Sequence, residues 1–330
     1  MQLCDSEKVS VPREPPVCIL GLGLIGGSLL RAATAAGREA WGWNRSSGSV
    51  EQARRDGFDA SDDLAATLHR AEEAGALLVV GVPIPAVDDL LAQIATHAPG
   101  CALTDVVSVK APVAAAVARH GLTARYVGGH PMAGTAESGW SASDADLFRG
   151  AVWVVATDDG ADPDVWRTVA ELALDCGSVV VPAESAEHDS AVARISHLPH
   201  LLAEALALAG ADGGDLALGL AAGSFRDGTR VAGTAPALVR AMCEANAAAL
   251  LIALDEALET LAAARKALAD ETSTATLVDA GHEARKRYEH HERREITDIT
   301  PGEPNWLERL RDAGRRGGVL PAQIRSASPG

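Results

Sequence analysis

The chain has 330 residues, of which 47% are hydrophobic and 22% charged, as is typical of a globular protein of one or two domains. Its formal net charge of −16 argues against a nucleic-acid backbone or an anionic membrane as the main partner. The N-terminus carries no apolar signal segment, no apolar run is long enough to span a bilayer, and the five cysteines form no C-x-x-C pair. We therefore expect a cytoplasmic protein with reduced cysteines.

The first half of the chain alternates short apolar runs with helical stretches rich in alanine and leucine. Residues 1–16 are expected to form a flexible lead-in. The predicted strands are 17–20, 39–43, 77–82, 102–105, 124–127, 152–156 and 179–181. Strands that alternate with helices pair in parallel in a sheet covered on both faces. The pattern predicts an α/β Rossmann domain over residues 17–183.

The second half is helical, and its strand signals stop near Pro182. Ser185 is predicted to cap a helix that runs on to Leu206, and Thr234 to open a second long helix. The second helix is apolar on more than one face, so we expect it to pack against neighbours, including another subunit. These features predict an all-α dimerisation domain over residues 184–297.

Two segments near the C-terminus have a different composition. The mixed-charge run 283–295 is predicted to be a solvated helical face. Residues 298–330 are expected to form a loop-rich tail with one short helix around 306–310.

A glycine-rich turn follows the first predicted strand and leads into a helix. Its glycines follow the spacing G-x-G-x-x-G. In this setting the first glycine allows the tight turn, the second lets the backbone approach a pyrophosphate, and the third lets the helix pack on the strand. The cofactor-binding residues predicted here are Gly21, Gly23, Leu24, Ile25 and Gly26.

The end of the second predicted strand bears on the choice of cofactor. NAD-selective sites usually place a carboxylate there to bind the ribose 2′-hydroxyl. This chain instead has Asn44, Arg45 and Ser46, which could contact a 2′-phosphate. The prediction is NADP or NAD, with NADP favoured.

Three further segments carry the polar groups that catalysis needs. They are TDVVSVK at 104–110, GGHPMAGT at 128–135, and EHD at 187–189 followed by SHLPH at 196–200. The first two follow predicted strands, where ligands gather in open α/β sheets. No cluster has the spacing of metal ligands, so no metal is predicted.

With the glycine turn and the segment SFRDGTRVA at 224–232, these motifs resemble the TyrA family, the prephenate and arogenate dehydrogenases of tyrosine biosynthesis. The resemblance covers residues 17 to about 240 and keeps the family's motif order. It implies a Rossmann domain followed by an all-helical domain that forms a homodimer. It also implies oxidative decarboxylation of a cyclohexadienyl substrate with hydride transfer to NAD(P)+.

The resemblance also assigns roles to individual residues. His130 is expected to accept the proton of the ring hydroxyl, and Ser108 to orient the histidine and that hydroxyl. His200 is expected to be a second active-site histidine, with His197 one turn earlier in support. Arg230 is expected to hold a substrate carboxylate with its bidentate fork.

Other polar residues of these motifs have two readings each. Lys110 could reach the nicotinamide or be solvated, and His188 and Asp189 could act in the site or only complement the helix dipole. Where many relatives carry an acidic residue after HPMAGT, this chain has Ala136, which weakens any choice between prephenate and arogenate. No βαββαβ pattern follows residue 295, so no regulatory ACT domain is expected, and tyrosine feedback would act at the active site.

Two alternatives to this function remain open at this point. A hydroxyacid or 6-phosphogluconate-type dehydrogenase has a similar layout, but it relies on a lysine at the start of the helical domain, where this chain has histidines. A non-catalytic dinucleotide sensor would bind cofactor without turning over substrate, and would have no reason to keep His130, Ser108 and Arg230 together.

Overall fold

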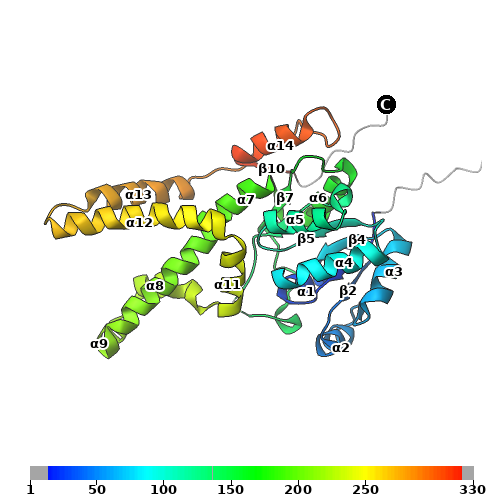
Figure 1. Cartoon of the computed structure of the whole chain (residues 1–330), viewed down its shortest axis with the longest axis horizontal. Helices are drawn as coiled ribbons and strands as arrows, with labels where there is room; N and C mark the ends of the chain where they lie inside the picture. The colour runs from blue at the N-terminus through cyan, green and yellow to red at the C-terminus, as the bar shows by residue number, and fades with distance from the viewer. Residues whose placement is uncertain (1–13, 136, 322–330) are drawn as a thin grey trace, which may run out of the picture.

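The computed structural model describes residues 14–135 and 137–321, and its first unit is a five-stranded parallel sheet (Figure 1). The strands lie in the order β3-β2-β1-β4-β5. They are β1 (Val17–Leu20), β2 (Ala40–Trp43), β3 (Ala60–Ser61), β4 (Leu77–Val80) and β5 (Ala102–Asp105). Chain order reverses next to β1, which is where open α/β sheets bind their ligands.

Neighbouring residues of each central strand point to opposite faces of the sheet, and both faces are apolar. Helices therefore cover both faces. In β1, Val17 and Ile19 belong to one apolar cluster, and Cys18 and Leu20 to another. The covering helices are α1 (Leu24–Ala35), α2 (Ser47–Arg55), α3 (Leu64–Ala74), α4 (Val87–His97) and α5 (Ala111–Arg119), with 3-10 turns at Ile84–Ala86 and Thr123–Arg125. The predicted Rossmann architecture is confirmed.

A second, three-stranded sheet extends this domain. It consists of β6 (Gly129–Pro131), β7 (Val152–Ala156) and β8 (Val179–Ala183), with the 3-10 turn Trp140–Ala142 and helix α6 (Pro163–Asp175) between them. β6 pairs antiparallel to β7. The prediction of a strand at 124–127 is wrong: the chain makes a 3-10 turn there, with one isolated bridge from Tyr126 to Leu103, and strand pairing begins at Gly129.

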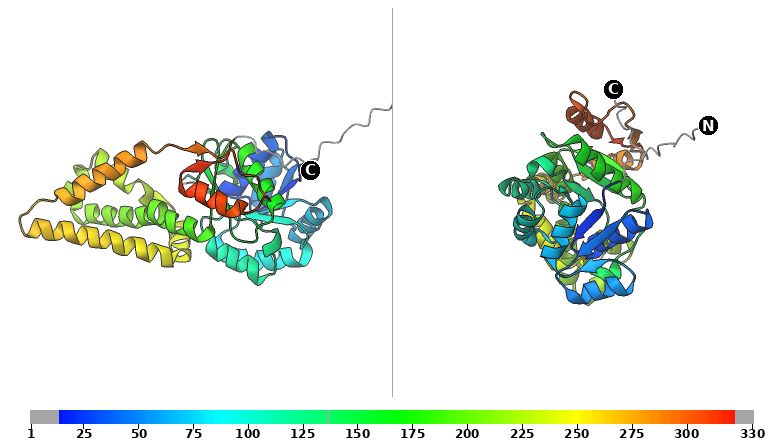
Figure 2. Two further views of the ribbon diagram at one scale, coloured as in Figure 1. Left: turned by 90° about the horizontal axis from the view of Figure 1, so that it is seen from above. Right: turned by 90° about the vertical axis from the view of Figure 1, so that its right-hand side faces the viewer.

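The chain then becomes helical and forms a lobe that projects away from the sheets in two arms (Figures 1 and 2). One arm is α8 (Leu198–Asp212) with α9 (Gly214–Gly219), and the other is the pair α12 (Ala247–Ala269) and α13 (Ala275–Glu289). The remaining elements are α7 (Ser185–Val192), the π-helical turn η4 (Ala193–His197), α10 (Gly223–Thr229), the 3-10 turn η5 (Arg230–Gly233) and α11 (Pro236–Ala245).

Two predictions about these helices are wrong. Ser185 does not cap α7: Glu184 is the N-cap, while the backbone N–H and the hydroxyl of Ser185 both donate to Asp158. The second long helix is two helices, because the chain bends by 95° between α11 and α12 at Asn246. The break matters for the site, since the side chain of Asn246 points inward there.

The C-terminal segment returns to the first domain. The charged run 283–295 is exposed as predicted, but it is helical only as far as the end of α13 at Glu289. β9 (Arg294–Glu295) follows and pairs with β10 (Gly318–Val319). These short strands correct the expectation that strands stop near Pro182. α14 (Trp306–Arg315) is longer than the predicted short helix. Trp306 packs edge-on against Trp166 of α6, with the two ring centroids 5.6 Å apart.

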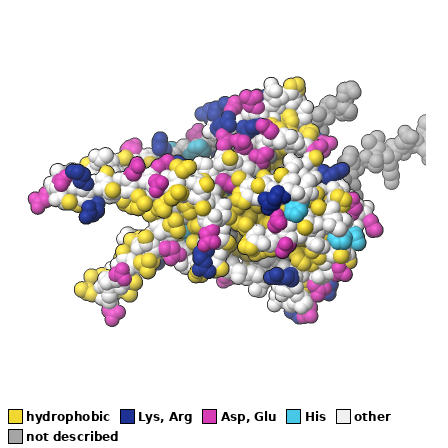
Figure 3. All heavy atoms as spheres, in the orientation of Figure 1, with side chains coloured by type: hydrophobic (Ala, Val, Ile, Leu, Met, Phe, Trp, Pro, Cys, Tyr) yellow, Lys and Arg dark blue, Asp and Glu magenta, His cyan; other side chains and the backbone are white. Residues whose placement is uncertain are grey.

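The helical lobe differs from the first domain in what it leaves exposed. Among the described residues, every large hydrophobic side chain that is exposed lies between Ile195 and Tyr288. Figure 3 shows hydrophobic side chains gathered along the lobe, where the two arms meet. No single helix of the described ranges is long and apolar enough to cross a membrane; α11 and α12 meet that test only as a bent pair.

Candidate active site

The glycine turn between β1 and α1 has the geometry of a dinucleotide cradle. Gly21 has φ +115°, and a Cβ there would lie 2.5 Å from the carbonyl oxygen of Gly81. A Cβ on Gly26 would lie 1.9 Å from the carbonyl oxygen of Gly21. Gly23 instead faces open space, and a Cβ there would meet nothing within 4 Å. The turn therefore packs tightly where it must and is open where a pyrophosphate would approach.

The start of α1 is free to bind an anion. Its N-cap is Gly23, which has no side chain to bond the first N–H groups, and no acidic residue lies in its first turn. Uncapped N–H groups and the positive end of the helix dipole favour a phosphate. This geometry fits the predicted cofactor residues, including Leu24 and Ile25, the first two residues of the helix.

The end of β2 presents the residues predicted to contact the adenosine ribose. Asn44 accepts a 3.4 Å hydrogen bond from the backbone N–H of Leu22, so this amide is tied to the glycine turn. Arg45 and Ser46 are exposed. The Ser46 hydroxyl accepts from the N–H of Ser49 at 3.5 Å and caps α2, a structural role that sequence reasoning had not assigned to it.

A buried ion pair organises the end of β5. The Lys110 ammonium pairs with Asp105 and donates to the carbonyl oxygen of Gly129 at 2.6 Å, and both charged side chains are fully buried. The Tyr126 hydroxyl donates to the second carboxylate oxygen of Asp105 at 2.7 Å. Burial lowers the pKa of Lys110, against the opposing effect of Asp105. Lys110 is thus not solvated; it holds Gly129, the residue before His130 in β6.

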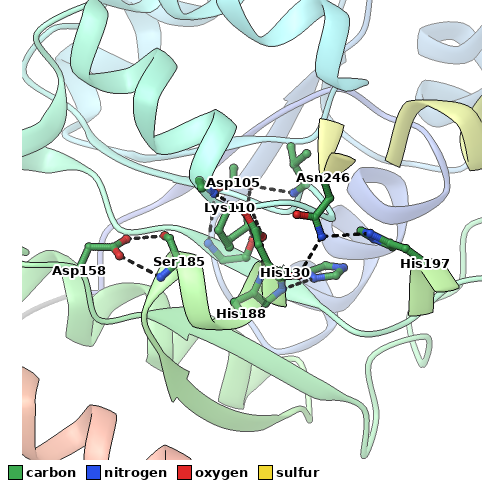
Figure 4. A network of polar contacts seen from close by, with 12 residues as sticks. Asp105, Lys110, His130, Asp158, Ser185, His188, His197 and Asn246 are labelled. Carbon is green, nitrogen blue, oxygen red and sulfur yellow. Dashed lines mark hydrogen bonds and ion pairs between the residues drawn. The ribbon is translucent and has the colours of Figure 1, made fainter. Parts of the chain in front are cut away.

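Three hydrogen-bonded side chains connect the two domains beside this ion pair, and Figure 4 shows two of them, His130 and His188, next to each other. Asp189 of α7 accepts from Nδ1 of His188 at 2.8 Å, and Nε2 of His188 lies 2.8 Å from Nδ1 of His130. Asp189 also accepts from the backbone N–H groups of Lys110 and Ala111, each at 2.8 Å. His188 and Asp189 therefore do more than complement the dipole of their helix.

The surroundings of His130 favour its neutral form. Its pKa lies well below the usual value, chiefly because of burial, and the nearby His188, Lys110 and His197 lower it further. A neutral imidazole at neutral pH can accept a proton. His130 thus has the protonation state that its predicted role requires.

His197 contacts a residue that sequence reasoning missed. Asn246, at the break between α11 and α12, donates to the backbone carbonyl of Asp189 at 2.8 Å and lies 3.2 Å from Nδ1 of His197. Burial lowers the pKa of His197 to about 4. His197 is almost fully buried, whereas His200, three residues on, is half-buried on α8. The only signal for Asn246 was a lone amide in an alanine-rich run.

The other predicted site residues lie around this centre. Ser108 is half-buried on the loop between Asp105 and Lys110. Arg230 is exposed at the start of η5, which packs against α8. Burial lowers the pKa of His200, and the positive charge of Arg230 also acts to lower it. Ala136 lies outside the described residues. Within residues 14–135 and 137–321, no three or more His, Cys, Asp and Glu side chains could jointly hold a metal ion.

Two family models match consecutive parts of the chain. The prephenate dehydrogenase nucleotide-binding domain matches residues 30–182, and the prephenate dehydrogenase dimerization domain matches residues 184–280. The first match begins after the glycine turn, so the turn is an independent observation.

Individual relatives agree with these matches. The prephenate dehydrogenase of Lactococcus lactis subsp. cremoris (strain MG1363) is 32% identical over 225 residues, 66% of this chain and 60% of that protein, so the chain spans less than two thirds of its length. A crystal structure from Corynebacterium glutamicum ATCC 13032, provisionally assigned as a prephenate dehydrogenase, is 51% identical with a TM-score of 0.90, covering 93% of this chain and 98% of that one. The Synechocystis arogenate dehydrogenase is 30% identical with a TM-score of 0.71, covering 83% and 99%.

Proposed function

The chain belongs to the prephenate dehydrogenase family, and from that premise we propose that it converts prephenate to 4-hydroxyphenylpyruvate and CO2 with NAD(P)+ as hydride acceptor. The observation that carries the proposal is the position of His130 in β6, next to the edge of the parallel sheet at which the glycine turn follows β1, together with the burial that lowers its pKa. That edge is the carboxyl end of the parallel strands, where β5 delivers Asp105 beside Gly129.

The chemistry needs a proton acceptor more than it needs a nucleophile. A bound nicotinamide supplies the hydride acceptor. His130 takes the proton of the ring hydroxyl as hydride leaves the same carbon, so that the C–O bond becomes a carbonyl. The ring carboxylate then departs as CO2, its bonding electrons enter the ring, and the resulting phenolate recovers the proton from His130. No net proton is consumed.

Substrate orientation is proposed to come from both domains. Ser108 lies on the loop that carries Lys110, and we assign it to the hydroxyl end of the substrate. Arg230 and His200 come from the packed pair η5 and α8 in the helical lobe, and we assign Arg230 to a substrate carboxylate. A site divided in this way holds the ring between the two domains.

The same residues suit arogenate, which differs from prephenate in an ammonium group in place of the side-chain keto group. The similarity to the Synechocystis arogenate dehydrogenase favours keeping it as the second candidate. A two-by-two assay of prephenate or arogenate with NAD+ or NADP+, read as kcat/KM, separates the four possibilities. Turnover of neither substrate would overturn the proposed function.

His130→Asn tests the proposed base. We expect kcat to fall by about 1000-fold while cofactor affinity stays within a few-fold, because only the proton acceptor is removed. His120→Asn, at the C-cap of α5 and outside the candidate site, is the control and should behave like the wild-type enzyme. Normal turnover by His130→Asn would refute this mechanism.

NADP is the favoured cofactor of the proposal. No carboxylate stands at Asn44 to repel a 2′-phosphate, and Arg45 is exposed beside it. Asn44→Asp should shift the ratio of kcat/KM values toward NAD+ by roughly tenfold, about 1.4 kcal/mol. An unchanged ratio would mean that residues other than Asn44 distinguish the 2′-hydroxyl of NAD+ from the 2′-phosphate of NADP+.

We also propose that the helical domain, from residue 184 onward, forms a homodimer. The family model that matches residues 184–280 is described as a dimerization domain. The exposed apolar side chains of the lobe, such as Leu251 and Ile252 at 59% and 58%, are the surface that a second copy would cover.

A further inference from the structure

The contacts between the two domains fix the order of donors and acceptors that ends at His130. We propose that Asp189 and His188 are positioning residues that set the tautomer of His130, leaving the lone pair of Nε2 free for the substrate. The proposal deepens the proposed function and rests on it for its kinetic consequence.

The order starts at Asp189, which is an acceptor only. Its carboxylate is buried and accepts from three N–H groups: the backbone of Lys110, the backbone of Ala111 and Nδ1 of His188. Burial alone would raise the pKa of this carboxyl, but those three hydrogen bonds outweigh it and hold the pKa below its usual value. Asp189 is therefore ionised and cannot donate.

Each following contact is determined by the one before it. Because Asp189 must accept, His188 carries a proton on Nδ1, and a ring with that single proton has only a lone pair to offer at Nε2. Nδ1 of His130, 2.8 Å away, must then be the donor. A neutral His130 with its proton on Nδ1 has an unprotonated Nε2, which finds no partner among the described residues.

This arrangement also explains how His130 can become charged during turnover. Proton uptake at Nε2 creates a cation close to the Lys110 ammonium, which opposes it, and to His197. The Nδ1–H of the cation donates more strongly to His188, which in turn donates to the anionic Asp189. The negative charge of Asp189 thus stabilises the protonated form of His130 through one intervening ring, that of His188.

The tautomer can be measured directly, without turnover. In the nitrogen-15 NMR spectrum of the full chain, we expect Nδ1 of His130 to show the shift of a protonated ring nitrogen and Nε2 that of an unprotonated one. The His130 signals are assigned by their absence from the spectrum of His130→Asn. Observation of the proton on Nε2 in the wild-type protein would overturn the proposal.

Two substitutions at position 188 separate positioning from packing. His188→Leu removes the acceptor, so the Nε2–H tautomer of His130 should appear and kcat should fall by about 100-fold with cofactor affinity unchanged. His188→Gln keeps an amide oxygen that can accept from His130 and an N–H that can donate to Asp189. It should keep the tautomer and stay within about tenfold of wild-type kcat.

The control is Ser190→Ala, on the exposed side of the same helix. It should change neither the spectrum nor kcat. If His188→Leu leaves both the tautomer and kcat unchanged, or if His188→Gln loses the tautomer as fully as His188→Leu, the proposal is wrong. If no protein turns over prephenate or arogenate, the proposed function fails, while the spectra still decide the tautomer.

Discussion

The nucleotide-binding domain and the helical lobe are built on opposite principles. The first domain buries two large apolar clusters, one on each face of its parallel sheet, and covers them with helices. The lobe has one small cluster of six buried apolar residues within the described chain, drawn from η4, α11 and α12. Many of its other large apolar side chains are exposed, Leu208, Leu216 and Leu220 among them.

The difference teaches where each domain obtains its stability. A sheet buried on both faces has its apolar residues removed from water within one chain, which supplies the main driving force for folding. A lobe with apolar side chains on several helix faces reaches the same burial only against another molecule. The candidate site draws residues from both, so one side of it comes from a domain with its own large apolar core and the other from the lobe that we propose a second copy covers.

The largest effect is expected from the buried ion pair of the first domain. Lys110→Met leaves Asp105 as an unpaired buried charge, and we expect the free energy of unfolding to fall by about 3–5 kcal/mol. The matched control is Lys266→Met in α12, whose pair with Asp270 is exposed and should contribute less than about 0.5 kcal/mol. Urea titration measures both; equal effects would mean that the two domains are not stabilised differently.

The next effect concerns the exposed face of the lobe. The double substitution Leu251→Glu and Ile252→Glu places two charges on the surface that a second copy is proposed to cover. We expect the dimer dissociation constant to rise about 100-fold, about 2.7 kcal/mol, as measured by light scattering over a concentration series. Ala35→Glu, at the exposed end of α1, is the control. An unchanged mass would place the interface elsewhere.

A smaller effect is expected at the part of the site that the lobe supplies. Arg230→Ala removes a charged hydrogen-bond donor, and we expect KM for the cyclohexadienyl substrate to rise roughly 30-fold, about 2 kcal/mol, with cofactor affinity unchanged. Arg226→Ala on the neighbouring α10 tests whether any nearby cation has this effect. Equal KM values for both variants would remove the role assigned to Arg230.

The last prediction concerns the slope of stability against pH at the junction of the domains, where the change per pH unit is smaller than the effects above. The pKa of His197 is about 4 in the folded protein and near 6.5 when unfolded, so the unfolded state binds the extra proton between these values. Unfolding free energy should therefore fall as the pH drops from 6.5 toward 4, and His130 acts in the same direction. His197→Gln should reduce that slope by up to about 1.4 kcal/mol per pH unit. A slope identical to wild type would show that His197 is protonated in the folded state.

Local signals in the sequence were enough to predict the Rossmann domain, the following helical domain and the glycine turn. Parallel strands, amphipathic helices and a G-x-G-x-x-G turn depend on residues that are close together in the chain. His130 was assigned through the resemblance to the TyrA family, and its place between a glycine and a proline argued only against a packing role.

The tertiary structure decided which polar residues act together. In the sequence Lys110 could reach the nicotinamide or be solvated, and only its burial against Asp105 and Gly129 excludes the second. His188 and Asp189 could complement a helix dipole, and only their contacts with His130 and with the start of α5 give them another role. These contacts join residues 58 and 79 positions apart, beyond the reach of any local pattern.

The same limit explains the errors in the predicted elements. The bend at Asn246 interrupts a run that has helical composition throughout, because the Asn246 amide bonds Asp189 and His197 rather than lying on a continuous helix. The antiparallel strand β6 carries His130 in place of the strand predicted at 124–127, since β7 pairs with it there. Composition and spacing thus determined which chemistry the chain carries, and long-range hydrogen bonds between buried polar groups decided how that chemistry is assembled.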